Sequence, residues 1–326
     1  MKAILVDKPG GPEVLTFAEV PDPEPGPGQI LIRVRAAGIN RADLLQRRGR
    51  YPSPPGESEI LGLEVAGEVE ALGPGVAGVA PRDRVFALVA GGGYADKAVV
   101  DHRLALPIPA RWSFVQAAAV PEAFFTAQEV LFAAGRLQAG EAVLIHAAAS
   151  GVGTAAVQMA RQVRTRVLVT AGTERKIKAV LELGAEAGCL YKEKDFASWV
   201  EEVTRKRGVD LIADPVGAAY WERNFRCLRE GGRLVVYGLL GGGTVSADLW
   251  TLMSRRVTVT GLVMRSRAPE EKAEIVRRFR MRWLPLLEAG VIRPVIDSVF
   301  PWEAVADAHR RMEANENVGK IVLEVP

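Results

Sequence analysis

In the first third of the chain, hydrophobic residues alternate with polar ones at the period of two that is typical of β-strands. Residues 29–35 place Ile30, Ile32 and Val34 on one face and two arginines on the other. Residues 63–71 and 84–89 have the same character, and glycine-rich turns are expected at 73–75 and 91–93. This pattern predicts an all-β region.

The pattern changes near residue 120 to an alternation of short apolar runs and helical periodicity. We expect strands at 143–146, 166–170, 189–191, 211–214, 233–237 and 257–263, and helices at 121–134, 152–163, 174–183, 196–204 and 220–228. Such alternation predicts a parallel, doubly wound α/β sheet. A helix over 270–289 then leads to a β-rich tail at 291–300 and 321–325, which we expect to rejoin the first region.

Composition narrows the class of protein. A chain of 326 residues exceeds the roughly 250–300 residues that one core usually supports, so two domains are expected. The net charge of +3 gives no reason to expect nucleic acid as the main partner. No run of about 18 apolar residues and no signal-peptide pattern occurs. The two cysteines, Cys189 and Cys227, are too few for a disulfide framework or a four-thiolate zinc lobe, and we expect reduced thiols in a cytoplasmic protein.

The strongest chemical signal is a strand, a turn of small residues and a helix over 143–156. Ser150, Gly151, Val152 and Gly153 lie where the helix starts, and they match the dinucleotide pattern G-x-G-x-x-G imperfectly because two of its glycines are replaced. Small residues let the backbone approach a pyrophosphate, and the helix N-terminus offers N–H groups and positive charge. A tight turn that binds nothing is the alternative.

The end of the second strand of this sheet suggests which dinucleotide binds. Gly172 and Thr173 stand where NAD-binding sites carry an acid, and Arg175 and Lys176 follow. A 2′-phosphate suits these cations, so we expect NADPH rather than NADH. Glu174 is the opposing signal, and a solvated helix face is the alternative.

These residues resemble the zinc-free, zeta-crystallin-like quinone oxidoreductases of the medium-chain dehydrogenase/reductase superfamily. The matching motifs run in order along nearly the whole chain: AG at 37–38, NRAD at 40–43, Tyr51, LGLEVAG at 61–67, QAAA at 116–119, ASGVG at 149–153, DPVG at 214–217, GGR at 231–233 and VGK at 318–320. The segments 237–243 and 312–320 are similar in particular to the tumour-suppressor-induced branch.

The resemblance implies a GroES-like β-domain at 1–121, a Rossmann NADPH-binding domain at 122–265, and a segment at 266–326 that returns to the first domain. It also implies an active site in the cleft between the domains. A homodimer is expected, with the β-branched strand 257–263 paired across a two-fold axis, and a tetramer of such dimers is left open.

The resemblance assigns roles to single residues, each with a plainer alternative. Asn40 would lie near the nicotinamide ribose or substrate, or simply cap a helix; Tyr51 would cover the nicotinamide or a quinone and donate a proton, or be an aromatic plug. The remaining cofactor candidates are Thr126 for the carboxamide, Tyr191 for the adenine side, Gly172 for the adenosine ribose, Gly238 and Leu239 for the nicotinamide side, and Asn317 at the tail. Asn315 is the alternative to Asn317, and either asparagine can be a turn residue. His146 is expected to be a satisfied core histidine.

Two departures from relatives matter. Zinc-dependent members have His where Leu63 stands and Cys at or beside Gly38, so no catalytic metal is expected. Relatives usually carry a glycine between the helix 152–163 and the next strand, and none occurs at 160–166, which leaves that turn uncertain.

The sequence therefore predicts a zinc-independent NADPH:quinone oxidoreductase. The alternative is an NADPH-dependent reductase of 2-alkenals or enones, in which Tyr51 would protonate the enolate. An RNA-binding or structural protein is disfavoured, because no patch of Lys and Arg interleaved with aromatic residues occurs.

Overall fold

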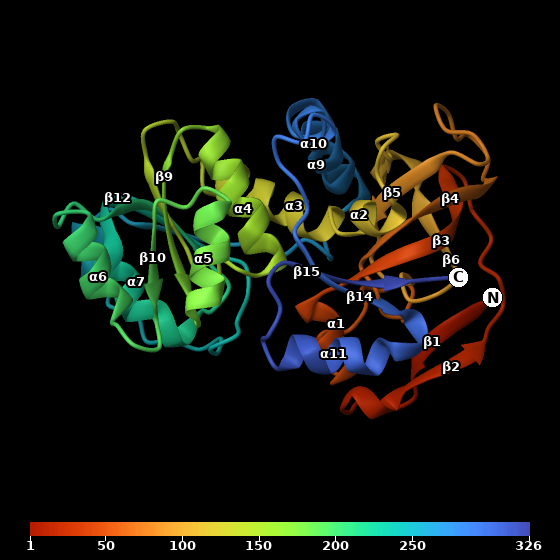
Figure 1. Cartoon of the computed structure of the whole chain (residues 1–326), viewed down its shortest axis with the longest axis horizontal. Coiled ribbons are helices and arrows are strands. Elements are labelled where there is room, and N and C mark those ends of the chain that lie inside the picture. Colours follow the sequence, from red (N-terminus) through yellow and green to blue (C-terminus); the bar gives the residue numbers. More distant parts are fainter. The chain divides into compact units, whose positions relative to one another are not determined.

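The computed structural model describes residues 1–326, which form two compact units (Figure 1). The first unit comprises Met1–Phe125 and Met264–Pro326, and the second unit comprises Thr126–Val263. The predicted fold class, a GroES-like β-domain and a doubly wound parallel sheet, is confirmed. None of the helices is both long and apolar enough to cross a bilayer.

The first unit is built on a seven-stranded sheet. Its strand order is β14-β15-β3-β4-β5-β7, with β6 also paired to β3. The strands are β3 (Gln29–Ile39), β4 (Glu64–Leu72), β5 (Arg84–Leu88), β6 (Lys97–Asp101), β7 (Ala105–Pro107), β14 (Ile296–Pro301) and β15 (Lys320–Glu324), and β1 (Lys2–Val6) pairs with β2 (Leu15–Glu19) beside them. The helices are α1 (Arg41–Arg47), α2 (Phe114–Ala118), α9 (Pro269–Arg282), α10 (Leu284–Glu288) and α11 (Val305–Glu313), with 3₁₀ turns η1 (Pro12–Val14), η2 (His102–Leu104) and η5 (Trp302–Ala304).

The C-terminal tail rejoins the first unit, as predicted. Strand β15 lies antiparallel to β3, with Ile321 opposite Ile39, and β14 lies parallel to β15. The single helix expected over 270–289 is instead two helices, α9 and α10, which meet at Trp283. Pro285 explains the break, because it lacks the N–H that would continue the α9 hydrogen-bond pattern.

The second unit is a fully parallel six-stranded sheet with the order β10-β9-β8-β11-β12-β13. Its strands are β8 (Ala142–Ile145), β9 (Arg166–Ala171), β10 (Ala187–Leu190), β11 (Val209–Asp214), β12 (Leu228–Val236) and β13 (Thr258–Gly261). The helices are α3 (Pro121–Gln128), which begins in the first unit, α4 (Gly151–Gln162), α5 (Glu174–Glu182), α6 (Phe196–Val203), α7 (Trp221–Cys227) and α8 (Leu249–Ser254). A π-helical segment, η3 (Glu129–Ala134), and a 3₁₀ turn, η4 (Ala218–Tyr220), complete this unit. Because both faces are covered, the central strand β11 is buried at all six positions.

Two local features differ from the sequence expectation. The helix expected to run to residue 134 changes at Glu129 into the wider π-helical geometry of η3. The turn that lacks a glycine, between α4 and β9, is closed by Arg164 in the left-handed conformation, with φ +59°. An L-residue adopts that conformation at a cost of about 1–2 kcal/mol, which is why a glycine is the usual solution.

Candidate functional site

The turn after β8 has the geometry of a phosphate site. Ser150 is the N-cap of α4, and its hydroxyl oxygen accepts from the Gly153 N–H at 3.0 Å. A Cβ on Gly153 would lie 2.5 Å from the Ala148 carbonyl oxygen, so only glycine permits this close packing of helix on turn. The first N–H groups of α4, at Gly151 and Val152, have no carbonyl within the helix to bond and remain available to an anion.

The second cluster follows β9. Thr173 caps α5 by accepting from the Lys176 N–H at 3.3 Å. A Cβ on Gly172 would lie 3.0 Å from the Tyr191 hydroxyl, so the structure brings Gly172 and Tyr191 together. The Tyr191 ring is 38% exposed and meets Tyr220 edge-on at 6.1 Å.

Arg223, which the sequence reasoning missed, adds a cation to this cluster. Its guanidinium lies 4.7 Å from the ring centres of both Tyr220 and Phe196. A single arginine among the aromatic residues of 220–225 was the available signal, but nothing in the chain order tied it to Tyr191.

The turns that follow β11 and β12 bond to each other. The Asp214 carboxylate accepts from the Val216 N–H at 2.6 Å and from the Gly217 N–H, which fixes the first turn. The Ala218 N–H donates to the Gly242 carbonyl at 2.9 Å. Gly238 packs against Pro215, and Leu239 after it is 61% exposed, so Gly238 and Leu239 lie at the carboxyl edge of the sheet, where ligands bind in such folds.

Two hydroxyl groups of the second unit are buried without a hydrogen-bond partner. They belong to Thr126, on α3, and to Tyr237, at the end of β12. An unpartnered buried hydroxyl costs free energy that a polar ligand group can recover. Thr126 was expected from the resemblance, whereas Tyr237 was missed because aromatic residues at strand ends are common in cores.

His146 is a satisfied core histidine, as expected. Its Nδ1 lies 2.9 Å from the Thr170 hydroxyl, and its Nε2 lies 2.8 Å from the side-chain oxygen of Asn224. Burial lowers its pKa to about 4, so the ring is neutral and serves no evident chemical role.

In the first unit, Asn40 belongs to a buried ionic cluster. Its side-chain N–H donates to Glu64 Oε1 at 2.9 Å, and its side-chain oxygen accepts from Lys320 Nζ at 2.5 Å. Lys320 Nζ also pairs with Glu64 Oε1 at 2.5 Å, and both side chains are almost fully buried. The other Glu64 oxygen accepts from the Glu122 N–H at 2.8 Å.

The sequence reasoning missed Glu64 and Lys320, although a signal was present. Each is a charged residue at the first position of a strand, β4 or β15, where three uncharged residues follow it, and the two charges are opposite. Gly38 makes room for them, because a Cβ there would lie 2.1 Å from Glu64 Oε1.

Behind Asn40 runs a chain of buried polar groups. Asp43 accepts from the Asn40 backbone N–H at 2.7 Å and from the Tyr94 hydroxyl at 3.0 Å. The Tyr94 oxygen lies 3.1 Å from His309 Nε2, and His309 Nδ1 lies 2.9 Å from Arg47. Arg47 then pairs with Glu313. These contacts hold the start of α1, and with it the amide of Asn40, in one orientation.

Tyr51 lies in the loop between α1 and β4 and is held from one side by Arg265. The Arg265 guanidinium lies 5.4 Å from the centre of the Tyr51 ring, and its Nη1 donates to the Tyr51 carbonyl at 3.4 Å. Burial raises the pKa of the partly buried Tyr51 hydroxyl, which makes no hydrogen bond. Arg265 was not expected from the sequence.

The side chain of Asn317 supports a turn of the backbone. It is buried, and its side-chain N–H donates to the Gly319 carbonyl at 2.8 Å, which supports the turn before β15. Asn315, the alternative, accepts from Arg41 at 2.7 Å.

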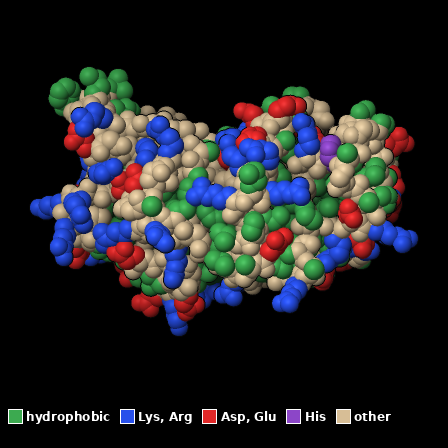
Figure 2. Space-filling model, turned by 90° about the horizontal axis from the view of Figure 1, so that it is seen from above, with side chains coloured by type: hydrophobic (Ala, Val, Ile, Leu, Met, Phe, Trp, Pro, Cys, Tyr) green, Lys and Arg blue, Asp and Glu red, His purple; other side chains and the backbone are tan.

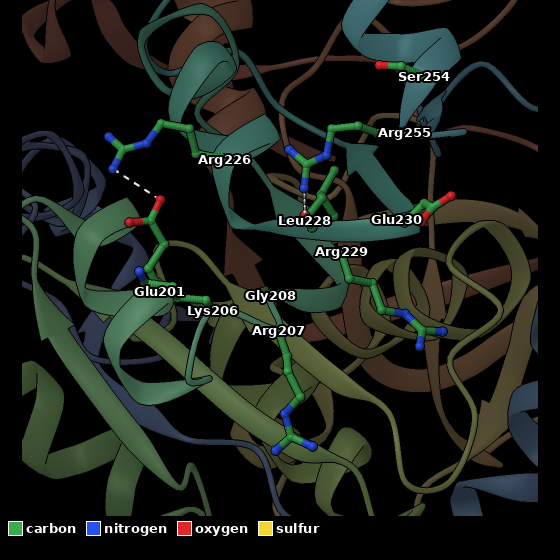
Figure 3. A pocket seen from close by; sticks show the side chains of 10 residues that line it. All are labelled: Glu201, Lys206, Arg207, Gly208, Arg226, Leu228, Arg229, Glu230, Ser254 and Arg255. Carbon is green, nitrogen blue, oxygen red and sulfur yellow. Dashed lines mark hydrogen bonds and ion pairs between the residues drawn. The ribbon is translucent and has the colours of Figure 1, made fainter.

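A cavity of about 310 Å³ opens in the second unit at the opposite edge of the sheet, where β11 and β12 begin (Figure 3). It is lined by Lys206, Arg207, Arg226, Arg229 and Arg255 among others. These cations sit where α6, α7 and α8 end, and Arg255 donates to the carbonyls of Phe225 and Leu228. Arg207 and Arg255 therefore bond carbonyls at helix C-termini, whereas Arg226 pairs with Glu201 and Arg229 pairs with Asp210. None of the expected nucleotide residues lines this cavity.

The arrangement fits a dinucleotide and does not fit a catalytic zinc ion. The available first-turn amides of α4 and the orphaned Thr126 hydroxyl are the observations that favour a dinucleotide. No group of three or more His, Cys, Asp or Glu side chains could hold a metal ion. The positions that would supply zinc ligands hold Gly38 and the buried Leu63.

Comparison with known proteins agrees with this geometry. Residues 26–110 match the alcohol dehydrogenase GroES-like domain family, and residues 151–280 match the family described as zinc-binding dehydrogenase. The human synaptic vesicle membrane protein VAT-1 homolog is 36% identical over 92% of this chain and 80% of its own length. Quinone oxidoreductase from Lama guanicoe is 34% identical over 99% of this chain and 97% of its own.

Two solved structures are similar over nearly the whole chain. Escherichia coli quinone oxidoreductase complexed with NADPH has a TM-score of 0.90 and 31% identity, covering 99% of this chain and 100% of that one. CurK enoyl reductase has a TM-score of 0.89 and 25% identity, covering 100% and 99%. The chain belongs to the medium-chain dehydrogenase/reductase superfamily, in the group that contains the quinone oxidoreductases and the VAT-1 homologues. The finer resemblance to the tumour-suppressor-induced branch stays a prediction.

The Glu122 carboxyl interacts electrostatically with Glu64 and Lys320 of the buried cluster around Asn40. This interaction leads to a prediction about stability. Burial, and next the charge of Glu64, raise the pKa of Glu122 from 4.5 to about 8. The folded protein therefore favours the neutral form of Glu122. The contribution of this carboxyl to folding stability is complete below pH 4.5 and is lost as the pH rises through 8. We expect the melting temperature of the Glu122→Gln variant to fall less than that of the parent between pH 6 and pH 9. Differential scanning fluorimetry measures this, with the exposed Glu288→Gln as control. Equal pH slopes in the parent and Glu122→Gln would contradict the prediction.

Proposed function

We propose that the protein is a zinc-independent NADPH:quinone oxidoreductase. The proposal rests on the presence in one chain of two features: a turn at 150–153 with free helix N–H groups, and a polar cluster around Asn40 that contains no set of metal ligands. The similarity to quinone oxidoreductases, one of them complexed with NADPH, supports both the cofactor and the reaction class.

Each nucleotide group has a candidate residue in the second unit. The N–H groups of Gly151 and Val152 would bind the pyrophosphate, and the Ser150 hydroxyl hydrogen is available to a phosphate oxygen. Thr173, Lys176 and Tyr191, beside Gly172, would hold the adenosine 2′-phosphate. The Thr126 hydroxyl would bond the carboxamide, and Gly238 and Leu239 would line the nicotinamide side.

The first unit would bind the acceptor, which is the molecule that receives the hydride. The amide of Asn40, fixed by Glu64 and Lys320, can donate to and accept from a ribose hydroxyl or a substrate carbonyl. Tyr51 would cover a flat ring, and Asn317 would support the tail beside Lys320. NADPH supplies the hydride. A reduced quinone is a weakly basic aromatic anion that takes a proton from solvent, so no strong acid–base pair is needed.

The face shown in Figure 2 gives no support to the RNA-binding alternative. Lys and Arg side chains are spread over the face shown in Figure 2, with Asp and Glu among them. The buried, unpaired thiols of Cys189 and Cys227 suit a reducing compartment such as the cytoplasm, where we place the protein.

The 2′-phosphate assignment predicts a change in coenzyme preference. Lys176→Glu should remove roughly 1.5–3 kcal/mol of the preference for NADPH over NADH, because a charge-assisted contact becomes a repulsion. Fluorescence titration of both nucleotides measures the ratio. Lys178→Glu, which makes the same charge change on the same helix, should leave the ratio unchanged, and equal affinities in the parent would refute the assignment.

The second candidate function is the reduction of an enone, and the similarity to an enoyl reductase supports it. Hydride addition to an enone leaves a basic enolate, and the unbonded Tyr51 hydroxyl is the candidate proton donor. Tyr51→Phe should then slow enone turnover at least ten-fold more than quinone turnover. Steady-state rates of NADPH oxidation with both acceptor classes measure this, and an equal effect on both would rule out the donor role.

We also propose that the protein forms a homodimer through the edge of the second-unit sheet. Strand β13 is paired only to β12, and α8 beside it exposes Leu249, Trp250 and Met253 by 66–70%. An open strand edge next to exposed apolar side chains favours pairing with a second copy. Sedimentation at micromolar concentration should give a dimer that Trp250→Glu shifts towards monomer, whereas Met281→Glu on α9 should not. A monomeric parent would refute the proposal, and pairing of dimers into tetramers would appear in the same experiment.

A further inference from the structure

The cavity at the edge of the second-unit sheet where β11 and β12 begin carries an excess of positive charge. Five of the side chains that line it are cationic, and only two, Glu201 and Glu230, are acidic. Both acids are already paired: Glu201 lies 3.2 Å from Arg226, and Glu230 lies 2.7 Å from Arg256, which is outside the lining. The acids of the cavity therefore leave most of its positive charge unbalanced.

Three of the lining cations, Lys206, Arg207 and Arg255, have no carboxylate partner. The Lys206 ammonium makes no hydrogen bond and no ion pair (Figure 3). Arg207 bonds only through its Nε, to the Thr204 carbonyl at 3.4 Å, so both of its Nη groups remain available as donors. Arg255 donates to two backbone carbonyls, which are neutral. These three side chains offer both charge and spare N–H groups to an anion.

The loop after α6 holds its cations in place although its backbone conformation is unfavourable. Arg205 and Lys206 are both left-handed, with φ +52° and +63°, a conformation that L-residues rarely adopt. The Lys206 N–H donates to the Glu201 carbonyl at 2.7 Å, and the Gly208 N–H donates to the Thr204 hydroxyl at 3.0 Å. Because these bonds fix the loop, a ligand would meet cations that are already ordered beside the cavity.

We propose that this cavity is a binding site for a small molecule that carries two linked phosphate groups. Its volume of about 310 Å³ lies within the roughly 300–1,000 Å³ of small-molecule sites. A phosphate group carries about −1.5 to −2 charge at pH 7, so two such groups balance three cations. Guanidinium and ammonium groups are the usual partners of phosphate oxygens. The cavity and the turn at 150–153 lie at opposite edges of one sheet, so the inference does not depend on the proposed function.

The test is isothermal titration calorimetry of the full chain with inorganic pyrophosphate, with NADPH present to occupy the proposed coenzyme site. We expect one pyrophosphate per chain. Lys206→Met and Arg207→Met should each weaken binding about ten-fold or more, because each removes a charge-assisted contact, and Lys206→Arg should retain most of the affinity. Orthophosphate, which has a single phosphate group, should bind about ten-fold more weakly than pyrophosphate.

Arg205→Met is the matched control. Arg205 is an exposed cation of the same loop with the same left-handed conformation, and it does not line the cavity. The control should weaken pyrophosphate binding less than two-fold. An equal loss in Arg205→Met and Lys206→Met would overturn the inference, because the anion would then respond only to the overall charge of the loop.

Three further results would overturn the inference: no binding of pyrophosphate to the parent, complete displacement of pyrophosphate by NADPH, or equal affinities for orthophosphate and pyrophosphate. Affinity for vesicles that contain a phosphoinositide, without affinity for free pyrophosphate, would also overturn it, because the ligand would then be a membrane surface. Failure of the parent to bind NADPH would refute the proposed function instead, and the comparison of Lys206→Met with Arg205→Met would still decide the role of the cavity.

Discussion

The ion pair between Glu64 and Lys320 is the interaction on which the first unit depends. It joins the first residue of β4 to the first residue of β15, strands that are 256 positions apart along the chain and that both flank β3. Removing one partner from a buried pair leaves the other charge buried and unpaired, at a typical cost of about 3–5 kcal/mol. The pair persists because each charge has further partners: Asn40 bonds both, and the Glu122 N–H bonds the carboxylate. One cluster therefore anchors the returning tail and fixes a candidate site residue.

The second unit depends on a different constraint, the close approach of backbone to backbone at the carboxyl edge of a parallel sheet. Gly153 packs on the turn after β8, Gly172 packs on Tyr191, and Gly238 packs on the turn after β11. At each place a side chain would push the neighbouring segment away. The edge is rigid because Asp214 and His146 use all their polar groups on neighbouring strands and turns. The Thr126 hydroxyl is the exception, because it is buried without a hydrogen-bond partner.

The sequence predicted the fold well because periodicity and small-residue turns are local properties. The six parallel strands and the return of the tail were expected, and the structure confirms them. The small-residue turn before α4 was also expected, and its role in binding phosphate stays a prediction. The π-helical turn at Glu129 and the division of the last long helix at Trp283 were not, because packing and one proline outweighed helical periodicity there. The left-handed conformation of Arg164 was not predicted either, because no sequence pattern identifies a residue other than glycine that adopts this conformation.

The candidate site was predicted less completely, and the missing residues share a physical property. Glu64, Lys320 and Arg265 are charged side chains that are almost fully buried, and bonds to distant segments, rather than local propensity, explain such positions. A sequence shows that a charge interrupts an apolar run, but it does not show whether a distant segment supplies the opposite charge. For Glu64 the structure supplies it, from Lys320.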